Sequence, residues 1–301
     1  MSAAAHASQA SIEWLDGADL DVARLGGKAV SLNRLARAGF RIPPGFCLTT
    51  DAFAAQITTI PGVERLAGDP RALADEPRRA ALVEEMMRGP LCASVADALR
   101  EPLARLAGQG LGGEGPTLLA VRSSGVAEDG AAASYAGLHD TELGLVAGDV
   151  APAILRCWAS LWSDRAVAYR ARRGLALDGG AMAVVVQALV PAIAAAVAFT
   201  RHPVTGRSDQ LLINAAPGLG EAMVSGEVTP DTIVVDKATR SVTEFTPGDS
   251  GGGSVLADDT LTELIALCLD LERAFGAPVD VEAAHATDGW YLLQARPITT
   301  S

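Results

Sequence analysis

Apolar residues recur at helical spacing in the first half of the chain. In the segment 26–40, Ala29, Leu32 and Leu35 fall on one helical face, and Gly39 supplies a C-terminal stop. The same spacing predicts further helices over residues 76–106 with a break at 88–90, over 151–174 and over 260–275. The first half is therefore predicted to be rich in helix.

Short apolar runs replace the helical pattern after residue 180. They are rich in β-branched residues and bounded by turn residues, which is typical of strands, and they cover residues 181–190, 194–200, 209–216 and 231–239. The fold class is therefore α/β (α+β), and the change of pattern at 178–182 marks a lobe boundary. The predicted parts are a flexible tail at 1–11, an N-terminal lobe at 12–179 and a C-terminal lobe at 180–301.

Composition narrows the possible functions. The 301 residues carry a net charge of −12, whereas nonspecific binding to nucleic acid depends on a basic surface. The four cysteines are widely spaced without a Cys-x-x-Cys pair, so neither a zinc site nor a disulfide framework is indicated. The N-terminus lacks a signal-peptide pattern, and Gln187 and Pro191 interrupt the longest apolar stretch. We therefore expect a cytoplasmic protein that binds neither nucleic acid nor membrane.

Two cations occupy positions that suit a phosphate ligand. Lys28 follows two glycines at the start of a predicted helix, where a lysine is electrostatically unfavourable. Arg122 stands at the end of a predicted strand, and the small residues at 131–137 offer backbone N–H groups that could approach phosphate. The alternative interpretations are a solvated surface lysine and an arginine paired with a nearby carboxylate.

The final hairpin alternates between apolar and polar positions. A three-residue turn at 287–289 places Glu282 opposite Gln294. The same register places Asp280 opposite Arg296, and it alone keeps both faces homogeneous, since a two-residue turn would mix them. Carboxylate and amide oxygens suit Mg²⁺ and arginine suits phosphate, although a solvated face with a weak ion pair is the alternative. The apolar face is predicted to carry Val279, Val281, Ala283, Leu293, Ala295 and Pro297.

Eight sequence blocks occur in an order that resembles a known family. They are "GGKAVSLNRLARAGFRIPPGFCLTT", "AVRSSGVAEDGAAASYAGLHDT", "CWASLWSDRAVAYR", "VVVQALV", "FTRHPVTG", "GLGEAMVSGEVTPD", "PVDVEAA" and "QARPIT". From about Trp14 to Thr299 the chain resembles the ATP-binding domain of the phosphoenolpyruvate synthase, pyruvate phosphate dikinase and rifampicin phosphotransferase family. The resemblance implies an ATP-grasp fold with the nucleotide between two lobes, and it implies ATP and Mg²⁺ as cofactors.

The resemblance also implies roles for individual residues. Lys28, Arg122 and Arg296 are the expected catalytic residues and ligands of the phosphates. Glu282 and Gln294 are the expected metal and nucleotide ligands. The other expected nucleotide-binding positions are Gly137 and Thr141 in the loop over the phosphates, Gln187 beside the adenine, and the backbone of Ala188 to Val190 at the base edge.

This sequence has no residue that resembles the phosphoryl carrier of the family. There, a histidine on a following swivelling domain carries the phosphoryl group, and none of the four histidines of this chain resembles it. We therefore expect a dikinase-type, ATP-dependent phosphotransferase module. It passes a phosphoryl group to a histidine on a separate domain or protein, and a small molecule is the final acceptor. The alternatives are a stand-alone ATP-grasp kinase or ligase and a non-catalytic nucleotide-binding regulatory domain.

Overall fold

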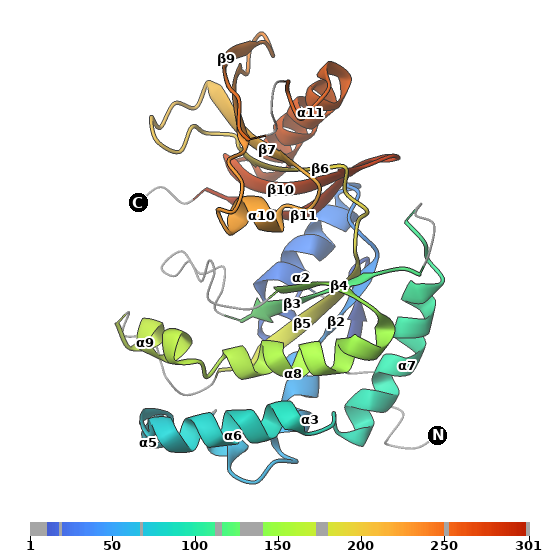
Figure 1. The fold of residues 1–301 in the computed structure, drawn as a ribbon, viewed down its shortest axis with the longest axis vertical. Helices are drawn as coiled ribbons and strands as arrows, with labels where there is room; N and C mark the ends of the chain where they lie inside the picture. The colour runs from blue at the N-terminus through green and yellow to red at the C-terminus, as the bar shows by residue number, and fades with distance from the viewer. Residues whose placement is uncertain are drawn as a thin grey trace. The chain divides into compact units, whose positions relative to one another are not determined.

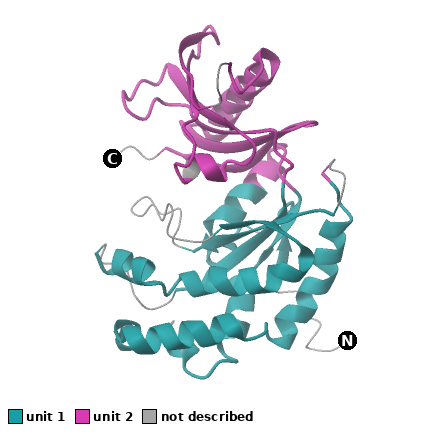
Figure 2. Ribbon diagram, viewed as in Figure 1, with its two compact units in different colours: residues 1–33, 44–110, 114–189 teal, residues 34–43, 111–113, 190–301 magenta. Residues whose placement is uncertain are grey.

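The computed structural model divides the chain into two compact units. It describes residues 11–17, 20–66, 69–111, 116–126, 141–172, 180–249 and 253–298. Unit 1 comprises residues 1–33, 44–110 and 114–189, and unit 2 comprises residues 34–43, 111–113 and 190–301 (Figure 2). Each unit contains its own sheet and hydrophobic core, so the class is mixed α/β as predicted.

Unit 1 is built on an antiparallel sheet with a fully buried central strand. Among the described residues this sheet has five strands, in the order β1-β2-β5-β3-β4 (Figure 1). They are β1 (Ile12–Trp14), β2 (Gly45–Leu48), β5 (Met182–Ala188), β3 (Leu119–Gly125) and β4 (Thr141–Leu145). β5 pairs with β2 on one side and β3 on the other, and all of its residues are buried. Burial on both faces explains its nearly continuous apolar sequence, "MAVVVQA".

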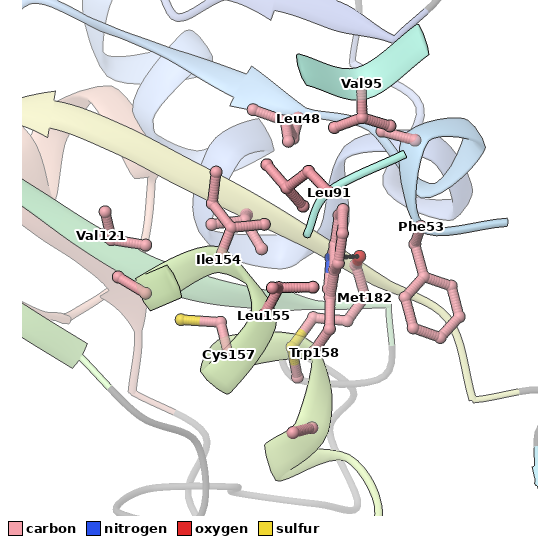
Figure 3. Packing of buried hydrophobic residues seen from close by; sticks show 14 of the residues in the cluster. Leu48, Phe53, Leu91, Val95, Val121, Ile154, Leu155, Cys157, Trp158 and Met182 are labelled. Carbon is pink, nitrogen blue, oxygen red and sulfur yellow. Dashed lines mark hydrogen bonds between the residues drawn. The ribbon is translucent and has the colours of Figure 1, made fainter. Parts of the chain in front are cut away.

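Helices complete the core of unit 1. They are α2 (Val22–Arg37, of which residues 34–37 belong to unit 2), α3 (Thr50–Ile57), α4 (Val63–Leu66), α5 (Pro70–Ala74), α6 (Glu76–Arg88), α7 (Ala93–Ala107), the 3-10 turn η1 (Ala147–Asp149), α8 (Val150–Ser160) and α9 (Asp164–Arg172). α8 packs on β3 and β5, and α6 packs on α8 (Figure 1). Trp158 of α8 is fully buried near Phe53, and its indole N–H donates to the Met182 carbonyl oxygen at 3.0 Å (Figure 3). This bond connects α8 to the first residue of β5.

The prediction of one helix over residues 151–174 is wrong, because the chain breaks after Ser160. Leu161 and Trp162 form a buried turn, and the Ser163 hydroxyl accepts a hydrogen bond from the Ala166 amide at 3.2 Å. A serine at this position satisfies an amide in the first turn of a new helix. The amphipathic pattern runs through both α8 and α9, which is why periodicity alone does not reveal the break.

Unit 2 combines a second antiparallel sheet with one long helix. Its described strands follow the order β11-β10-β6-β7-β8-β9. They are β6 (Ala194–Phe199), β7 (Gln210–Pro217), β8 (Asp231–Asp236), β9 (Val242–Thr246), β10 (Val279–Ala286) and β11 (Gly289–Pro297), with the helices α10 (Glu221–Val224) and α11 (Asp258–Phe275). α11 presents Leu264, Cys268 and Leu271 to one face of this sheet and ends at Gly276, whose φ is 66°. The core of unit 2 therefore lies between α11 and this face of the sheet.

The sequence pattern predicts a lobe boundary between residues 179 and 180, and the last change from unit 1 to unit 2 along the chain falls between residues 189 and 190. The sequence pattern assigns β5 to the C-terminal lobe, because the strand-rich composition begins there. Its hydrogen-bonded partners are nevertheless β2 and β3 of unit 1. Apolar composition indicates that a strand is buried, but it does not specify which sheet the strand joins.

None of the helices in the described ranges has the length and apolar character needed to cross a bilayer.

Candidate nucleotide-phosphate and metal site

The start of α2 contains a glycine turn that rests against β3. Gly26 has φ 71° and ψ 170°, a conformation that is essentially restricted to glycine. A Cβ atom at Gly26 would lie 2.0 Å from the backbone oxygen of Ser124. The Ser124 hydroxyl donates to the Leu25 carbonyl oxygen at 2.8 Å and accepts from the Ala29 amide at 3.2 Å. Ser124 therefore fixes the point at which the helix resumes, and sequence reasoning did not single it out.

Lys28 lies within this turn, immediately before Ala29. The first amides of a helix have no acceptor within the helix, and together with the helix dipole they attract anions. Lys28 is half-buried, and the turn holds its backbone at the beginning of the resumed helix. A lysine and a helix N-terminus thus occur together, which is a combination suited to binding phosphate.

Arg122 and Thr141 are direct cross-strand partners in the sheet of unit 1. The register pairs Arg122 of β3 with Thr141 of β4 and with Val185 of β5. Strand alternation places Arg122 on the same face as Ser124, and that face meets the glycine turn of α2. The opposite face includes Val121, which lies in the hydrophobic core. Three predicted phosphate residues, Lys28, Arg122 and Thr141, are thus associated with one face of one sheet.

Gln187 lies on the same face of unit 1, two residues along β5 from Val185. Its side chain is buried and lies over Gly45, where a Cβ atom would approach the Gln187 Cγ to 2.6 Å. A glycine at position 45 is therefore needed to accommodate this glutamine. Gly137, the other predicted loop residue, lies outside the described residues.

Two amides of the backbone that is predicted to contact the edge of the base already form hydrogen bonds within the protein. The Ala188 amide donates to the Pro44 carbonyl oxygen at 2.9 Å, and the Leu189 amide donates to the Leu118 carbonyl oxygen at 2.8 Å. Val190 follows in the chain and belongs to unit 2. Binding of a base by this segment would have to use groups other than these two amides, and the adenine role of Gln187, Ala188 and Val190 stays a prediction.

The final hairpin of unit 2 confirms the predicted pairing. Glu282 is opposite Gln294, and Asp280 is opposite Arg296. The neighbouring positions Val279 and Val281 point to the other face, where they belong to the core beneath α11. One face of the hairpin therefore carries two carboxylates, an amide and a guanidinium in adjacent positions.

The predicted three-residue turn of this hairpin is wrong. Ala286 pairs with Gly289, so the turn consists of Thr287 and Asp288, and Gly289 has φ 114°. The register then shifts between Glu282 and Ala283, which leaves Leu293 as an extra residue of β11. This bulge restores the pairing of Glu282 with Gln294. It also places Leu293 outside the core beneath α11, with a second apolar cluster that contains Val190, Ala284, Ala286 and Tyr291.

Asp280 joins the candidate site through an ion pair with Arg296, although the sequence analysis did not name it as a site residue. The Nε and Nη2 atoms of Arg296 lie 2.9 Å and 2.8 Å from the Asp280 Oδ2 atom. Burial raises the pKa of Asp280, and the charge and hydrogen bond of Arg296 only partly offset that effect. A cation bound beside Asp280 would favour its ionised form. The alternation of the hairpin indicates this pairing, but it does not indicate the burial that makes the carboxylate unusual.

The turn of the hairpin is held by an arginine from the segment after α2. Arg41 donates to the backbone oxygen of Asp288 at 2.6 Å and to the Tyr291 hydroxyl at 2.6 Å, and it forms an ion pair with the Asp288 carboxylate. The Arg41 guanidinium also lies 4.0 Å from the centre of the Tyr291 ring. These contacts restrict the turn and so support the register of the strands that follow.

The donor atoms of the hairpin fit a magnesium ion better than a transition metal. Carboxylate and amide oxygens from Glu282 and Gln294 are hard ligands, and Mg²⁺ is commonly bound by one or two carboxylates together with phosphates. The described residues contain no group of three or more His, Cys, Asp or Glu side chains placed to hold a metal by themselves. Phosphate oxygens of a ligand would therefore have to complete the coordination.

Residues 22–250 match the family described as pyruvate phosphate dikinase, AMP/ATP-binding domain. The chain belongs to this family. Similar proteins include a probable phosphoenolpyruvate synthase of Methanocaldococcus jannaschii, which is 36% identical over 96% of this chain and 27% of its own length. A rifampicin phosphotransferase of Streptomyces sp is 38% identical over 95% of this chain and 36% of its own length.

A further relative of this dikinase ATP-binding family carries a different activity in its name. The prodigiosin synthesizing transferase PigC of Serratia marcescens is 36% identical over 93% of this chain and 32% of its own length. The chain thus spans about a third of the length of these three relatives. The family resemblance noted from the sequence blocks is confirmed.

Proposed function

We propose that this chain is the ATP-using module of a dikinase-type phosphotransferase. The observation that carries the proposal is the arrangement of unit 1, where Arg122 and Thr141 face each other on the side of the sheet that meets the glycine turn before Lys28. In a protein of the AMP/ATP-binding family, this arrangement suits the phosphates of ATP.

The residues of both units take part in the proposed reaction. Lys28, Arg122 and Arg296 bind the phosphates and stabilise the negative charge that develops during transfer. Glu282 and Gln294 hold Mg²⁺, which when bound neutralises phosphate charge, and Asp280 orients Arg296 through their ion pair. This assignment corresponds to the ATP-grasp fold that the family resemblance implies.

The acceptor in this proposal is a histidine on another domain or protein. Relatives are named for phosphoenolpyruvate synthase and rifampicin phosphotransferase activities, and this chain corresponds to about a third of their length. Transfer through a carrier histidine separates ATP cleavage from the final small-molecule acceptor. One type of ATP module can therefore serve different acceptors, and the identity of the acceptor here is set outside this chain.

Mg²⁺-ATP should stabilise the isolated chain against heat. A ligand at about a hundred times its Kd adds about 2.7 kcal/mol to the free energy of unfolding. Arg122→Ala should retain the fold but weaken ATP binding by about 1.5–3 kcal/mol, because it removes charge-assisted hydrogen bonds. Arg100→Ala is the control, since Arg100 is exposed on α7 and pairs with Asp97. An unchanged melting temperature at millimolar Mg²⁺-ATP would refute ATP binding.

Phosphoryl transfer should depend on an added carrier. We expect little ATP consumption by this chain alone, because transfer needs a nucleophile in line with the phosphorus. Adding the histidine-bearing domain of a relative should produce labelled carrier from β-³²P-ATP, together with AMP and phosphate. The same domain with its histidine replaced by alanine is the control. Rapid labelling of a small molecule by the lone chain would instead support a direct kinase.

A further inference from the structure

Arg201 follows β6, and its guanidinium has no acceptor among the described residues. Within the described residues it makes no hydrogen bond or ion pair, and its Nε atom is completely covered by protein. The side chain as a whole is only half-buried. An N–H group removed from water without an acceptor is destabilising, so most buried polar groups in proteins are hydrogen-bonded. Arg201 is therefore an exception that needs an explanation.

A second arginine on the same loop, Arg207, does have a carboxylate partner. Arg207 lies on the same loop, and its Nε and Nη2 atoms bind the two carboxylate oxygens of Asp209 at 3.0 Å and 2.6 Å. The chain contains 36 acidic residues against 24 lysines and arginines. The lack of a carboxylate beside Arg201 is thus not a consequence of too few acidic residues.

The backbone on both sides of Arg201 is held in place. The Thr200 amide donates to the Val279 carbonyl oxygen at 2.9 Å, and the Thr200 hydroxyl accepts from the Val279 amide at 2.8 Å. The His202 amide donates to the Arg207 carbonyl oxygen at 3.0 Å. The His202 Nδ1 atom accepts from the amides of Val204 and Thr205, which closes the turn that follows. Binding of a ligand by Arg201 therefore requires no further ordering of its backbone.

Arg201 lies at the end of unit 2 that carries the Asp280–Arg296 pair. Phe199, two residues earlier, is the cross-strand partner of Asp280, and Thr200 binds the backbone of Val279. The Asp280 carboxylate is already engaged by Arg296. Asp280 therefore does not neutralise Arg201.

We propose that Arg201 binds a phosphate-type oxyanion at the end of β6. The proposal rests on the proposed function, because it places a further phosphate ligand beside the hairpin assigned to ATP. A guanidinium offers several N–H donors in one plane, which matches the oxygens of a phosphate group. The oxyanion is either a distal phosphate of the nucleotide or free orthophosphate, and the chemistry that recognises the two is the same.

Calorimetric titrations with Mg²⁺-ATP, AMP and orthophosphate would test this assignment. The variants are Arg201→Met, which keeps the apolar stem, and Arg201→Lys, which keeps the charge but loses the planar donors. Arg207→Met is the matched control on the same loop. We expect Arg201→Met to weaken binding of ATP or of orthophosphate about tenfold or more and Arg201→Lys to weaken it less, with AMP binding unchanged in both. The melting temperature of ligand-free Arg201→Met should not fall, since the substitution removes an unsatisfied N–H.

The possible outcomes identify which phosphate Arg201 binds, or they show that Arg201 binds none. A selective loss of ATP binding assigns Arg201 to a nucleotide phosphate, and a selective loss of orthophosphate binding assigns it to the free ion. Equal losses in the Arg201 and Arg207 variants, or unchanged affinity for both ligands in either Arg201 variant, would overturn the inference. If the wild-type chain binds no ATP at all, the proposed function fails first. If it binds ATP and the Arg201 variants bind equally well, only the role of Arg201 fails.

Discussion

Gly26→Ala should destabilise unit 1 by about 2–6 kcal/mol and abolish tight ATP binding. The backbone at Gly26 lies in a region that costs other residues roughly 1–3 kcal/mol. The added Cβ atom would also meet the backbone oxygen of Ser124 at 2.0 Å, and such overpacking typically costs about 1–3 kcal/mol more. Relief of the contact would move the turn away from β3, and Lys28 would move with it. Chemical denaturation followed by far-UV circular dichroism gives the loss of stability.

Gly39→Ala is the matched control for this substitution. Gly39 also has a positive φ, of 85°, but a Cβ atom there has nothing within 4 Å. We expect it to cost about 1–2 kcal/mol from backbone strain alone and to leave ATP binding intact. If the Gly26 and Gly39 variants lost equal stability, the contact with Ser124 would not be the cause.

Glu282→Gln should remove the Mg²⁺ dependence of ATP binding and lower carrier-dependent phosphoryl transfer about a hundredfold. The substitution keeps the size of the side chain and removes its charge. An ion bound by one or two carboxylates depends strongly on each of them, and loss even of groups that only support a ligand costs about 10–100-fold. Titration of ATP with and without Mg²⁺, followed by transfer kinetics with the carrier domain, measures both effects.

Glu244→Gln provides the control for the charge itself. Glu244 is exposed on β9 and lies on the same face of the sheet as Asp280. Successive cross-strand pairs connect the two residues through Val234, Leu212 and Phe199. The variant should behave like the wild type in both measurements. A Glu282 variant that retained Mg²⁺-dependent binding would exclude the hairpin as the metal site, and a large loss of thermal stability would indicate a structural role instead.

Strand alternation was sufficient to predict which hairpin residues face each other. Only one arrangement keeps the polar residues around Glu282 and Gln294 on one face, and the structure has that pairing. The turn was not predictable in the same way. Moving one residue from the turn into β11 leaves the chain length between Glu282 and Gln294 unchanged, so the sequence fits a three-residue turn equally well.

Long-range contacts mark the limit of prediction for the rest of the site. The two glycines before Lys28 indicate a turn. The residue that contacts this turn, Ser124, lies 99 residues from Leu25 along the chain. A local sequence pattern cannot predict a contact over that separation. Arg201 shows a related limit. Whether an arginine has a carboxylate beside it depends on how strands and loops meet in space, and the many acidic residues of this chain would suggest that it does.

The bulge at Leu293 affects the dielectric surroundings of the candidate metal ligands. By turning to the face of Glu282 and Gln294, Leu293 joins Tyr291, Ala284 and other apolar side chains of the second cluster there. Hydrocarbon beside a charged group displaces polarisable water, so Coulomb interactions weaken less with distance than they do at a fully hydrated surface. A carboxylate and a guanidinium in such surroundings exert stronger forces on a bound cation or phosphate. The extra residue of β11 would thus strengthen the electrostatic interactions of the candidate site, although Leu293 itself carries no charge.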